Sequence, residues 1–241
     1  MYFQPGFLIA GGVILLIALA FLWWGRSSML KAKRIEDTPT TPCRNVRDGF
    51  VEVKGRVKGK TGLLTSPLAK VQCVYYRFHV EEQVRRGKNT YWETRIDDKQ
   101  CCGLLIEDAS QAHVEVNLLA ADLILKPDAH AKSGFLKDAT PELEATLSSY
   151  GHSSQGFLFN RTLRYTETYL EVGDEMYVLG TAQHDGGGGA VIDKGGDLFI
   201  VSDQSEEQLT RSFHNKKLGG FITGGVLGAV ALALCAMSVV R

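Results

Sequence analysis

The segment VQCVYYRFHVEEQV at residues 71–84 decides the fold class, because it is rich in β-branched and aromatic residues and alternates in polarity. Alternate side chains of a strand point to opposite faces of its sheet. One face would carry Val74, Tyr76, Phe78 and Val80, and the other would carry Cys73, Tyr75, Arg77 and His79. The segment therefore predicts a long strand.

The sequence on both sides of this segment continues as short strands separated by turn signals. Phe50–Lys60 alternates apolar or small residues with charged ones, which predicts a strand with one solvated face. Further predicted strands are Tyr91–Ile96, Cys101–Ile106, His113–Leu118, Asp122–Leu125, Leu163–Leu170, Glu175–Thr181 and Leu198–Val201, with turns at Asp108–Gln111 and Asp185–Gly189. Short strands at this spacing predict a mainly β fold, a small antiparallel β-barrel or sandwich with one or two short helices.

Two helix starts interrupt the strand pattern. Thr140-Pro141 combines a capping residue with a proline suited to the first turn, and Gly151 can end that helix. Ser205-Glu206-Glu207-Gln208 is a capping box that opens a second helix. We expect this second helix to run into the apolar segment that follows it.

The two ends of the chain are apolar and differ in composition from the middle. FLIAGGVILLIALAFLWW at 7–24 and LGGFITGGVLGAVALALCAMSVV at 218–240 carry no charge, and the first reaches about 27 Å, enough to span a hydrocarbon core. Both are predicted to be transmembrane helices. The predicted organisation is an anchor at 1–24, a linker at 25–48, the β-rich domain at 49–205, a juxtamembrane helix at 206–217 and a second span at 218–240.

Charge at the flanks of these spans predicts the orientation. The domain side carries Arg26, Lys31, Lys33, Arg34, Arg211, Lys216 and Lys217, whereas the far side offers only Arg241. The positive-inside rule then places the β-rich domain in the cytoplasm and both termini outside. Five cysteines in a chain of 241 residues fit a reducing compartment with free thiols. The Asn160-Arg161-Thr162 glycosylation acceptor would need a lumenal domain, so we interpret it as chance.

Several ordered motifs between the two spans resemble one known family. They are Val53-Lys54-Gly55, Ser66-Pro67-Leu68, Cys73-Val74-Tyr75-Tyr76-Arg77, Trp92, Arg164-Tyr165-Thr166-Glu167, Gly173-Asp174 and Tyr177-Val178-Leu179-Gly180. Over roughly residues 49–205 the chain is similar to the GIDE-type, or "beside a membrane", domain of the MULAN-like membrane-anchored E3 ubiquitin ligases. The resemblance implies structural or binding roles for Gly55, Ser66, Pro67, Cys73, Tyr75, Tyr76, Arg77, Trp92, Arg164, Glu167, Gly173, Asp174 and Gly180.

Members of that family with ligase activity carry a zinc-binding RING domain after the second span, where this sequence holds one arginine. Two zinc sites would need about eight spaced Cys and His ligands. The chain has one adjacent pair, Cys101-Cys102, and no CxxC motif. We therefore expect no bound metal, no cofactor and no catalytic residue, and we do not extend the ligase activity to this chain.

Other functional signals are weak in this sequence. The Gly186–Gly189 run lacks the Lys-Ser or Lys-Thr of a phosphate loop, and Asp185, Asp193 and Asp197 lack a calcium-binding repeat. Lys54, Arg56, Lys58 and Lys60 beside Tyr75, Tyr76, Tyr91 and Trp92 form the best binding signal. This strand has three interpretations: a solvated face, a surface for anionic lipid headgroups, or a nucleic-acid site, which the near-neutral charge disfavours.

Glycines in the second span suggest helix packing. Gly220, Gly224 and Gly228 recur every fourth residue and would form a groove for another helix backbone, either the first span through Gly11, Gly12 and Ala18 or a second copy of the chain. Two functions stay open at this point. One is a membrane-anchored, non-enzymatic interaction module with an unknown protein partner, and the other is a divergent member of an E3 ubiquitin-ligase-like pathway without its own RING.

Overall fold

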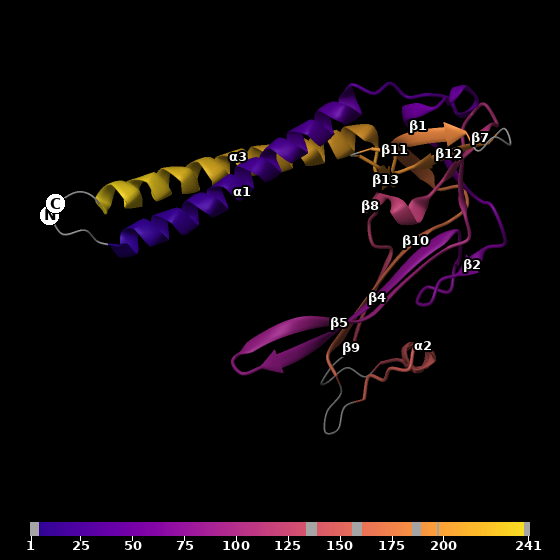
Figure 1. Cartoon of the computed structure of the whole chain (residues 1–241). Helices are drawn as coiled ribbons and strands as arrows, with labels where there is room; N and C mark the ends of the chain where they lie inside the picture. Colours follow the sequence, from indigo (N-terminus) through magenta and orange to yellow (C-terminus); the bar gives the residue numbers. More distant parts are fainter. Residues whose placement is uncertain (1–4, 134–138, 156–160, 185–188, 197, 239–241) are drawn as a thin grey trace. The chain divides into compact units, whose positions relative to one another are not determined.

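The computed structural model describes residues 5–133, 139–155, 161–184, 189–196 and 198–238 (Figure 1). The chain forms two compact units, residues 1–39 with 205–241 and residues 40–204. The predicted turn residues 185–188, Asp197, Asn160, and Val240 with Arg241 lie outside the described residues. Each unit is described on its own below.

The first unit is a pair of long antiparallel helices, α1 (Pro5–Glu36) and α3 (Glu206–Met237). Both are long and apolar enough to cross a bilayer, and only 11% and 17% of their most apolar windows are buried within the chain. A core helix of a soluble domain would hide most of such a surface, so the pair is compatible with a two-pass membrane protein. Residues 25–36, assigned to a linker by composition, instead continue α1, and Ser205 caps α3 by accepting the Gln208 N–H at 3.3 Å.

Small residues bring the backbones of α1 and α3 close together. A Cβ atom at Gly220 would lie 2.7 Å from the Gly25 Cα, and one at Gly224 would lie 2.8 Å from the Leu22 Cγ. Gly228 has no neighbouring atom within 4 Å of that position, so it lies outside the seam between α1 and α3. A helix turns about 100° per residue, so Gly228 points some 80° away from the direction of Gly220 around the α3 axis. The buried Ala231 points only about 20° away and therefore lies on nearly the same side of α3 as Gly220.

The second unit contains a closed five-stranded barrel, which confirms the predicted mainly β fold and selects a barrel over a sandwich. Its ring of neighbours is β1 (Gly49–Gly59), β6 (Leu104–Glu107), β7 (His113–Val116), β12 (Ala190–Asp193) and β11 (Glu175–His184), which pairs back to β1. β13 (Ile200–Ser202) and β8 (Asp122–Ile124) extend this sheet beyond β11. The β7–β12 and β8–β13 pairs are parallel, and the other pairs of this sheet are antiparallel.

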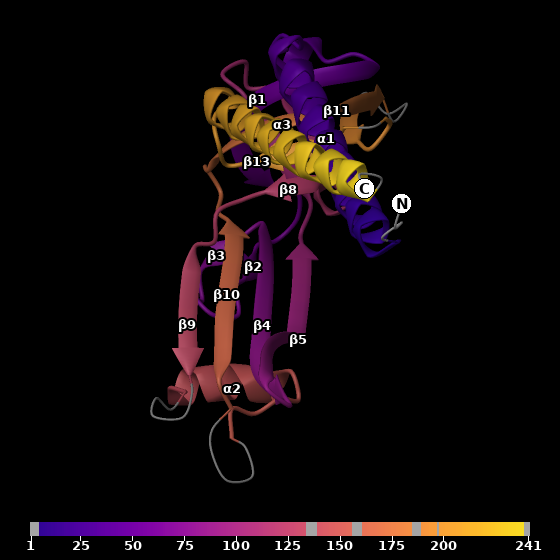
Figure 2. The same cartoon turned by 90° about the vertical axis from the view of Figure 1, so that its left-hand side faces the viewer.

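Two insertions into the barrel sequence assemble a separate four-stranded antiparallel sheet. β4 (Tyr75–Arg86) and β5 (Asn89–Cys101) lie between β1 and β6 in the chain, and β9 (Ala129–Ser133) and β10 (Leu163–Leu170) lie between β7 and β11. Their order is β5-β4-β10-β9 (Figure 2). α2 (Pro141–Ser149), capped by Thr140 as expected, packs Leu147 against one face. The smaller elements are β2 (Leu64–Thr65), β3 (Gln72–Cys73), η1 (Cys43–Asn45) and η2 (Leu118–Ala120).

The observed strands follow the predicted ones with specific differences. The predicted strand at 71–84 is divided between β3 and β4 at Val74. The side chains of Val74 and Tyr75 join the barrel core, whereas that of Tyr76 joins the core of the four-stranded sheet. Tyr75 is therefore buried although it alternates with Tyr76. The short strands β2, β9 and β12 were not predicted, because each has only a few residues and gains its stability from its neighbours.

Candidate functional site

One face of the four-stranded sheet is polar and ordered by ion pairs. Phe78 and Val80 of β4 point to the core below α2, so the alternating residues Arg77, His79 and Glu81 point to the opposite side. Pairing with β5 and β10 adds their cross-strand neighbours. We call this set the polar face: Arg77, His79, Glu81, Trp92, Thr94, Asp97, Lys99, Arg164 and Thr166.

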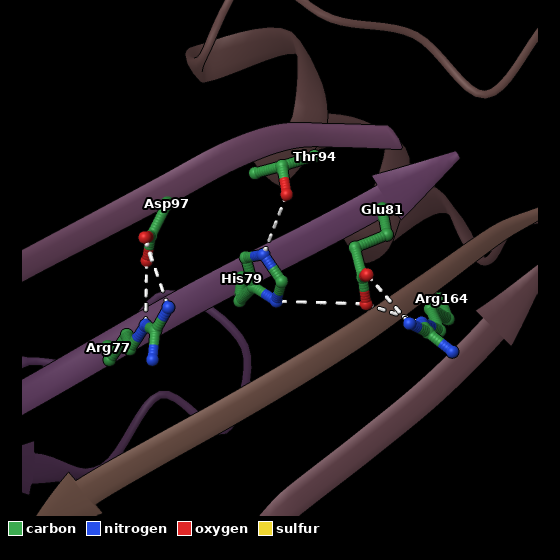
Figure 3. Close-up of polar contacts among 6 residues, drawn as sticks. All are labelled: Arg77, His79, Glu81, Thr94, Asp97 and Arg164. Carbon is green, nitrogen blue, oxygen red and sulfur yellow. Dashed lines mark hydrogen bonds and ion pairs between the residues drawn. The ribbon is translucent and has the colours of Figure 1, made fainter. Parts of the chain in front are cut away.

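Two bidentate ion pairs organise the polar face (Figure 3). Arg77 donates to both oxygens of Asp97, with Nε at 2.7 Å and a terminal nitrogen at 3.1 Å. Arg164 donates to both oxygens of Glu81, in one case with its terminal nitrogen at 2.6 Å. The arginine hydrogen bonds hold the pKa of Glu81 and of Asp97 below the ordinary values of these carboxyls. Both carboxylates therefore stay ionised and act as fixed charges.

His79 and Trp92 complete this arrangement. The His79 Nε2 lies 3.2 Å from the Thr94 hydroxyl, and its Nδ1 lies 3.8 Å from the Glu81 carboxylate. The Arg164 guanidinium lies 4.3 Å from the centre of the Trp92 ring, a cation–π contact. Arg164 is thus held by a carboxylate and an aromatic ring at once, which fixes its position on the sheet.

A β-bulge explains how Trp92 reaches the polar face. Val80 pairs with Ile96 and Glu81 pairs with Thr94, so Arg95 is an extra residue in β5. The insertion reverses the alternation, so that Thr94 and Trp92 share a face with Asp97. Without the extra residue, simple alternation from Asp97 would direct Trp92 to the opposite face of the sheet.

A second group of motif residues holds a loop rather than a surface. Glu167 is fully buried, and its two oxygens accept the backbone N–H groups of Leu68 at 2.7 Å and Ala69 at 2.8 Å. Ser66 accepts the Val71 N–H at 3.3 Å, and the Pro67 carbonyl accepts the Thr146 hydroxyl of α2 at 3.4 Å. These contacts give Glu167, Ser66 and Pro67 a structural role at the 66–71 loop.

Three further motif residues lie in the interior. Tyr75 and Tyr76 are buried, and the Tyr76 hydroxyl donates to Asp98 at 2.9 Å. Burial raises the pKa of Tyr76 to about 12. Burial likewise raises the pKa of the Cys73 thiol to about 11. Cys73 is therefore protonated at neutral pH and unsuited to nucleophilic chemistry.

The remaining motif residues shape the barrel. A Cβ at Gly55 would lie 2.5 Å from the Glu107 carbonyl oxygen, and one at Gly180 would lie 2.7 Å from Ile192 and Phe199. Asp174 accepts the Glu171 N–H at 2.8 Å in the turn that contains Gly173. The motif set thus separates into the polar face, through Arg77, Trp92 and Arg164, and packing positions elsewhere.

The sequence model of the GIDE family, described as E3 Ubiquitin ligase, matches residues 79–236. The chain belongs to the GIDE family. The match runs from His79 on β4 into α3, so it includes Trp92, Arg164 and Glu167. No curated protein and no solved structure matches this chain.

Metal-ligating clusters and the basic strand β1 are the other candidate binding features. Among the described residues, no group of three or more His, Cys, Asp or Glu side chains could hold a metal ion. Each basic residue of the predicted binding strand lies beside a carboxylate, in the pairs Lys54–Glu52 at 3.2 Å, Arg56–Glu175 at 3.9 Å, Lys58–Glu107 at 3.2 Å and Lys60–Glu115 at 2.7 Å. This pairing reduces the positive potential that the strand offers to an anionic partner.

Sequence alternation identified part of this site. It placed Arg77 and His79 on one face, and Glu81 continues the same alternation. Asp97, Thr94 and Lys99 were not identified, because their position depends on the register with β4 and on the bulge at Arg95. The predicted strand at Tyr91–Ile96 ended before Asp97 and Lys99, so of these three residues only Thr94 lay in a predicted strand.

The ion pairs of the polar face predict a pH dependence of stability. Because the pKa values of Glu81 and Asp97 are lowered in the folded state, their pairs stabilise it fully above the ordinary values of 4.5 and 3.8. That contribution is lost as the pH falls further and the carboxylates become protonated. We expect the unfolding midpoint of the GIDE-family chain in detergent to fall from pH 6 to pH 3 more steeply than that of the Arg77→Gln/Arg164→Gln variant. If the unfolding midpoints of the two proteins fall equally with pH, the two ion pairs are not the source of the pH dependence.

Proposed function

We propose that this chain is a membrane-anchored, non-enzymatic interaction module that binds a protein partner through the polar face. The observation that carries the proposal is the difference between the two faces of the four-stranded sheet. One face is covered by α2, whereas the other presents Arg77, Trp92 and Arg164 in a fixed arrangement. Arginine and aromatic residues are enriched where protein interfaces bind most strongly.

The electrostatics of the polar face support binding rather than catalysis. Its carboxylates are engaged by arginines that lower their pKa values, so they are poor proton donors near neutral pH. The buried Cys73 thiol has a pKa raised to about 11, which keeps it from forming a thiolate. Fixed and paired charges of both signs suit the recognition of a complementary charged surface.

Cross-linking from the polar face tests this function in native membranes. A photo-reactive residue at position 99, where the Lys99 side chain is 44% exposed, should form discrete protein adducts. The same residue at position 56 on the barrel, where Arg56 is 70% exposed, serves as the matched control. Arg77→Glu should reduce the adducts from position 99 several-fold. Equal labelling from both positions, or none from position 99, would refute the proposed face.

The charge of the helical unit supports a cytoplasmic location for the β-rich unit. The basic residues of α1 and α3 lie at the ends that join residues 40–204: Arg26, Lys31, Lys33, Arg34, Arg211, Lys216 and Lys217. Positive charge of this kind is retained on the cytoplasmic side.

Topology is tested by a reporter inserted after Pro127, which is exposed between β8 and β9. A reporter that functions only in the cytoplasm should be active there, and one that functions only outside should be inactive. The same pair fused at the N-terminus provides the control and should give the opposite result. Activity of the outside reporter at Pro127 would invert the proposed orientation.

A second candidate function follows from the description of the matched family as E3 Ubiquitin ligase. In this case the chain would take part in a ubiquitin-ligase-like pathway, and a partner would supply the zinc-binding domain. The cross-linking experiment separates the two candidates by the identity of the adducts. A partner with a RING domain would favour the ligase-like pathway, whereas other proteins would favour a separate scaffold role.

A further inference from the structure

The β4–β5 hairpin extends beyond the rest of the four-stranded sheet. The pairing of β10 with β4 ends at Leu163 and Glu82, whereas β4 and β5 remain paired from Gln83–Trp92 to Arg86–Asn89. A tight two-residue turn, Gly87 and Lys88, closes the hairpin, and Gly87 has a positive φ of 62°. We call residues 83–92 the basic arm, a two-stranded ribbon that projects from the sheet (Figure 1).

The basic arm combines positive charge with exposed aromatic residues. It contains Arg85, Arg86 and Lys88 and no acidic residue, although the whole chain has 27 basic and 27 acidic side chains. The Arg86 side chain is 72% exposed even while it contacts Glu93 at 2.6 Å. Tyr91 is 48% exposed and Trp92 is 37% exposed. Even with the adjacent Glu93 counted, residues 83–93 hold three basic residues and one acidic residue, so the arm is locally cationic on a chain of zero formal net charge.

We propose that the basic arm docks on the anionic headgroup surface of the membrane that holds the chain. Tyrosine and tryptophan favour the membrane–water interface, and basic residues near an anionic leaflet each strengthen binding about fivefold. The inference rests on the proposed membrane attachment, which keeps the arm at a high effective concentration near lipid.

The placement of the aromatic residues favours lipid over single-stranded nucleic acid. Adjacent side chains of a strand point to opposite faces, so Tyr91 and Trp92 stand on different sides of the arm. One side of the Trp92 ring is also occupied by Arg164 at 4.3 Å. Proteins that bind single strands stack successive bases on aromatic residues of one surface. The two aromatic side chains of the arm do not share one surface. A ribbon with an aromatic side chain on each face can instead place its tip in the membrane–water interface, which contacts both faces.

Fluorescence of Trp92 tests the proposal on the full chain. In the Trp23→Phe/Trp24→Phe background Trp92 is the only remaining tryptophan. The chain is placed in nanodiscs of brominated phosphatidylcholine with or without about a third phosphatidylglycerol, since bromine quenches nearby tryptophan. We expect at least threefold stronger quenching in the anionic discs, and its loss at high salt. Arg85→Gln/Arg86→Gln/Lys88→Gln should abolish the difference, whereas the control triple Arg47→Gln/Lys126→Gln/Lys194→Gln should retain it.

The other outcomes are distinguishable. Incorporation of the chain without anion-dependent quenching would overturn the docking of the arm and leave the membrane attachment intact. A chain that fails to enter nanodiscs would overturn the attachment and the docking together. If a single-stranded oligonucleotide changes Trp92 fluorescence while lipid composition has no effect, the arm would be a nucleic-acid site and the lipid assignment would be wrong.

Discussion

Replacing Glu167 with alanine should destabilise the β-rich unit by about 3 kcal/mol, because two charge-assisted hydrogen bonds are lost and two donors are left without an acceptor. The carboxylate is fully buried and accepts the Leu68 and Ala69 N–H groups at 2.7 and 2.8 Å. The 66–71 loop that it holds also contacts α2 through Pro67 and Thr146. Urea unfolding of the full chain in detergent, followed by the circular dichroism of the strands, measures the loss.

Two variants control for the interpretation of this result. Glu167→Gln keeps one acceptor oxygen and should lose about half as much stability. Glu175→Ala removes a carboxylate that is 86% exposed and lies 3.9 Å from Arg56, so its effect should stay within about 0.5 kcal/mol. Hydrogen exchange should accelerate at residues 66–71 in Glu167→Ala alone. Equal effects of Glu167→Ala and Glu175→Ala would mean that the loop is held by other contacts.

Gly220→Leu should separate the two helices of the first unit and lower stability by about 2 kcal/mol or more. The new Cβ would lie 2.7 Å from the Gly25 Cα, and backbone atoms can give way only if α1 and α3 move apart. Close approach at small residues is a main source of helix association in lipid. Thermal unfolding in detergent, together with the monomer fraction measured by size exclusion, tests the effect.

The adjacent glycine provides the matched control. Gly219→Leu introduces the same side chain one residue away, where no atom lies within 4 Å of the new Cβ, and should leave stability unchanged. If Gly220→Leu instead dissociates an oligomer into folded monomers, the glycines would form a seam between copies of the chain. Equal behaviour of the two variants would contradict any packing role for Gly220.

The motif residues of the barrel and those of the four-stranded sheet have different roles. The barrel is built from β1, β6, β7, β12 and β11, and its insertions between β1 and β6 and between β7 and β11 supply all four strands of the second sheet. Motif residues such as Gly55 and Gly180 permit close packing in the barrel. The motif residues Arg77, Trp92 and Arg164 belong to the inserted sheet, which is where we propose that a partner binds.

Local physical chemistry in the sequence was sufficient for the longer helices and strands. Apolar length predicts two spanning helices, alternation predicts β1 and β4, and the capping residues Thr140 and Ser205 mark the starts of α2 and α3. These features depend on residues close together in the chain, so they can be read without knowledge of the fold.

Features that depend on pairing were decided by the tertiary structure. β9, with the sequence Ala-His-Ala-Lys-Ser, has little strand propensity and is a strand because β10 supplies its hydrogen bonds. Gly228 repeats the spacing of Gly220 and Gly224, yet helical rotation turns it away from α1. The bulge at Arg95 brings Trp92 over Arg164, a contact that alternation along β5 alone would exclude. Local sequence thus determined the long helices and strands, whereas pairing between distant strands determined the short strands and which side chains meet.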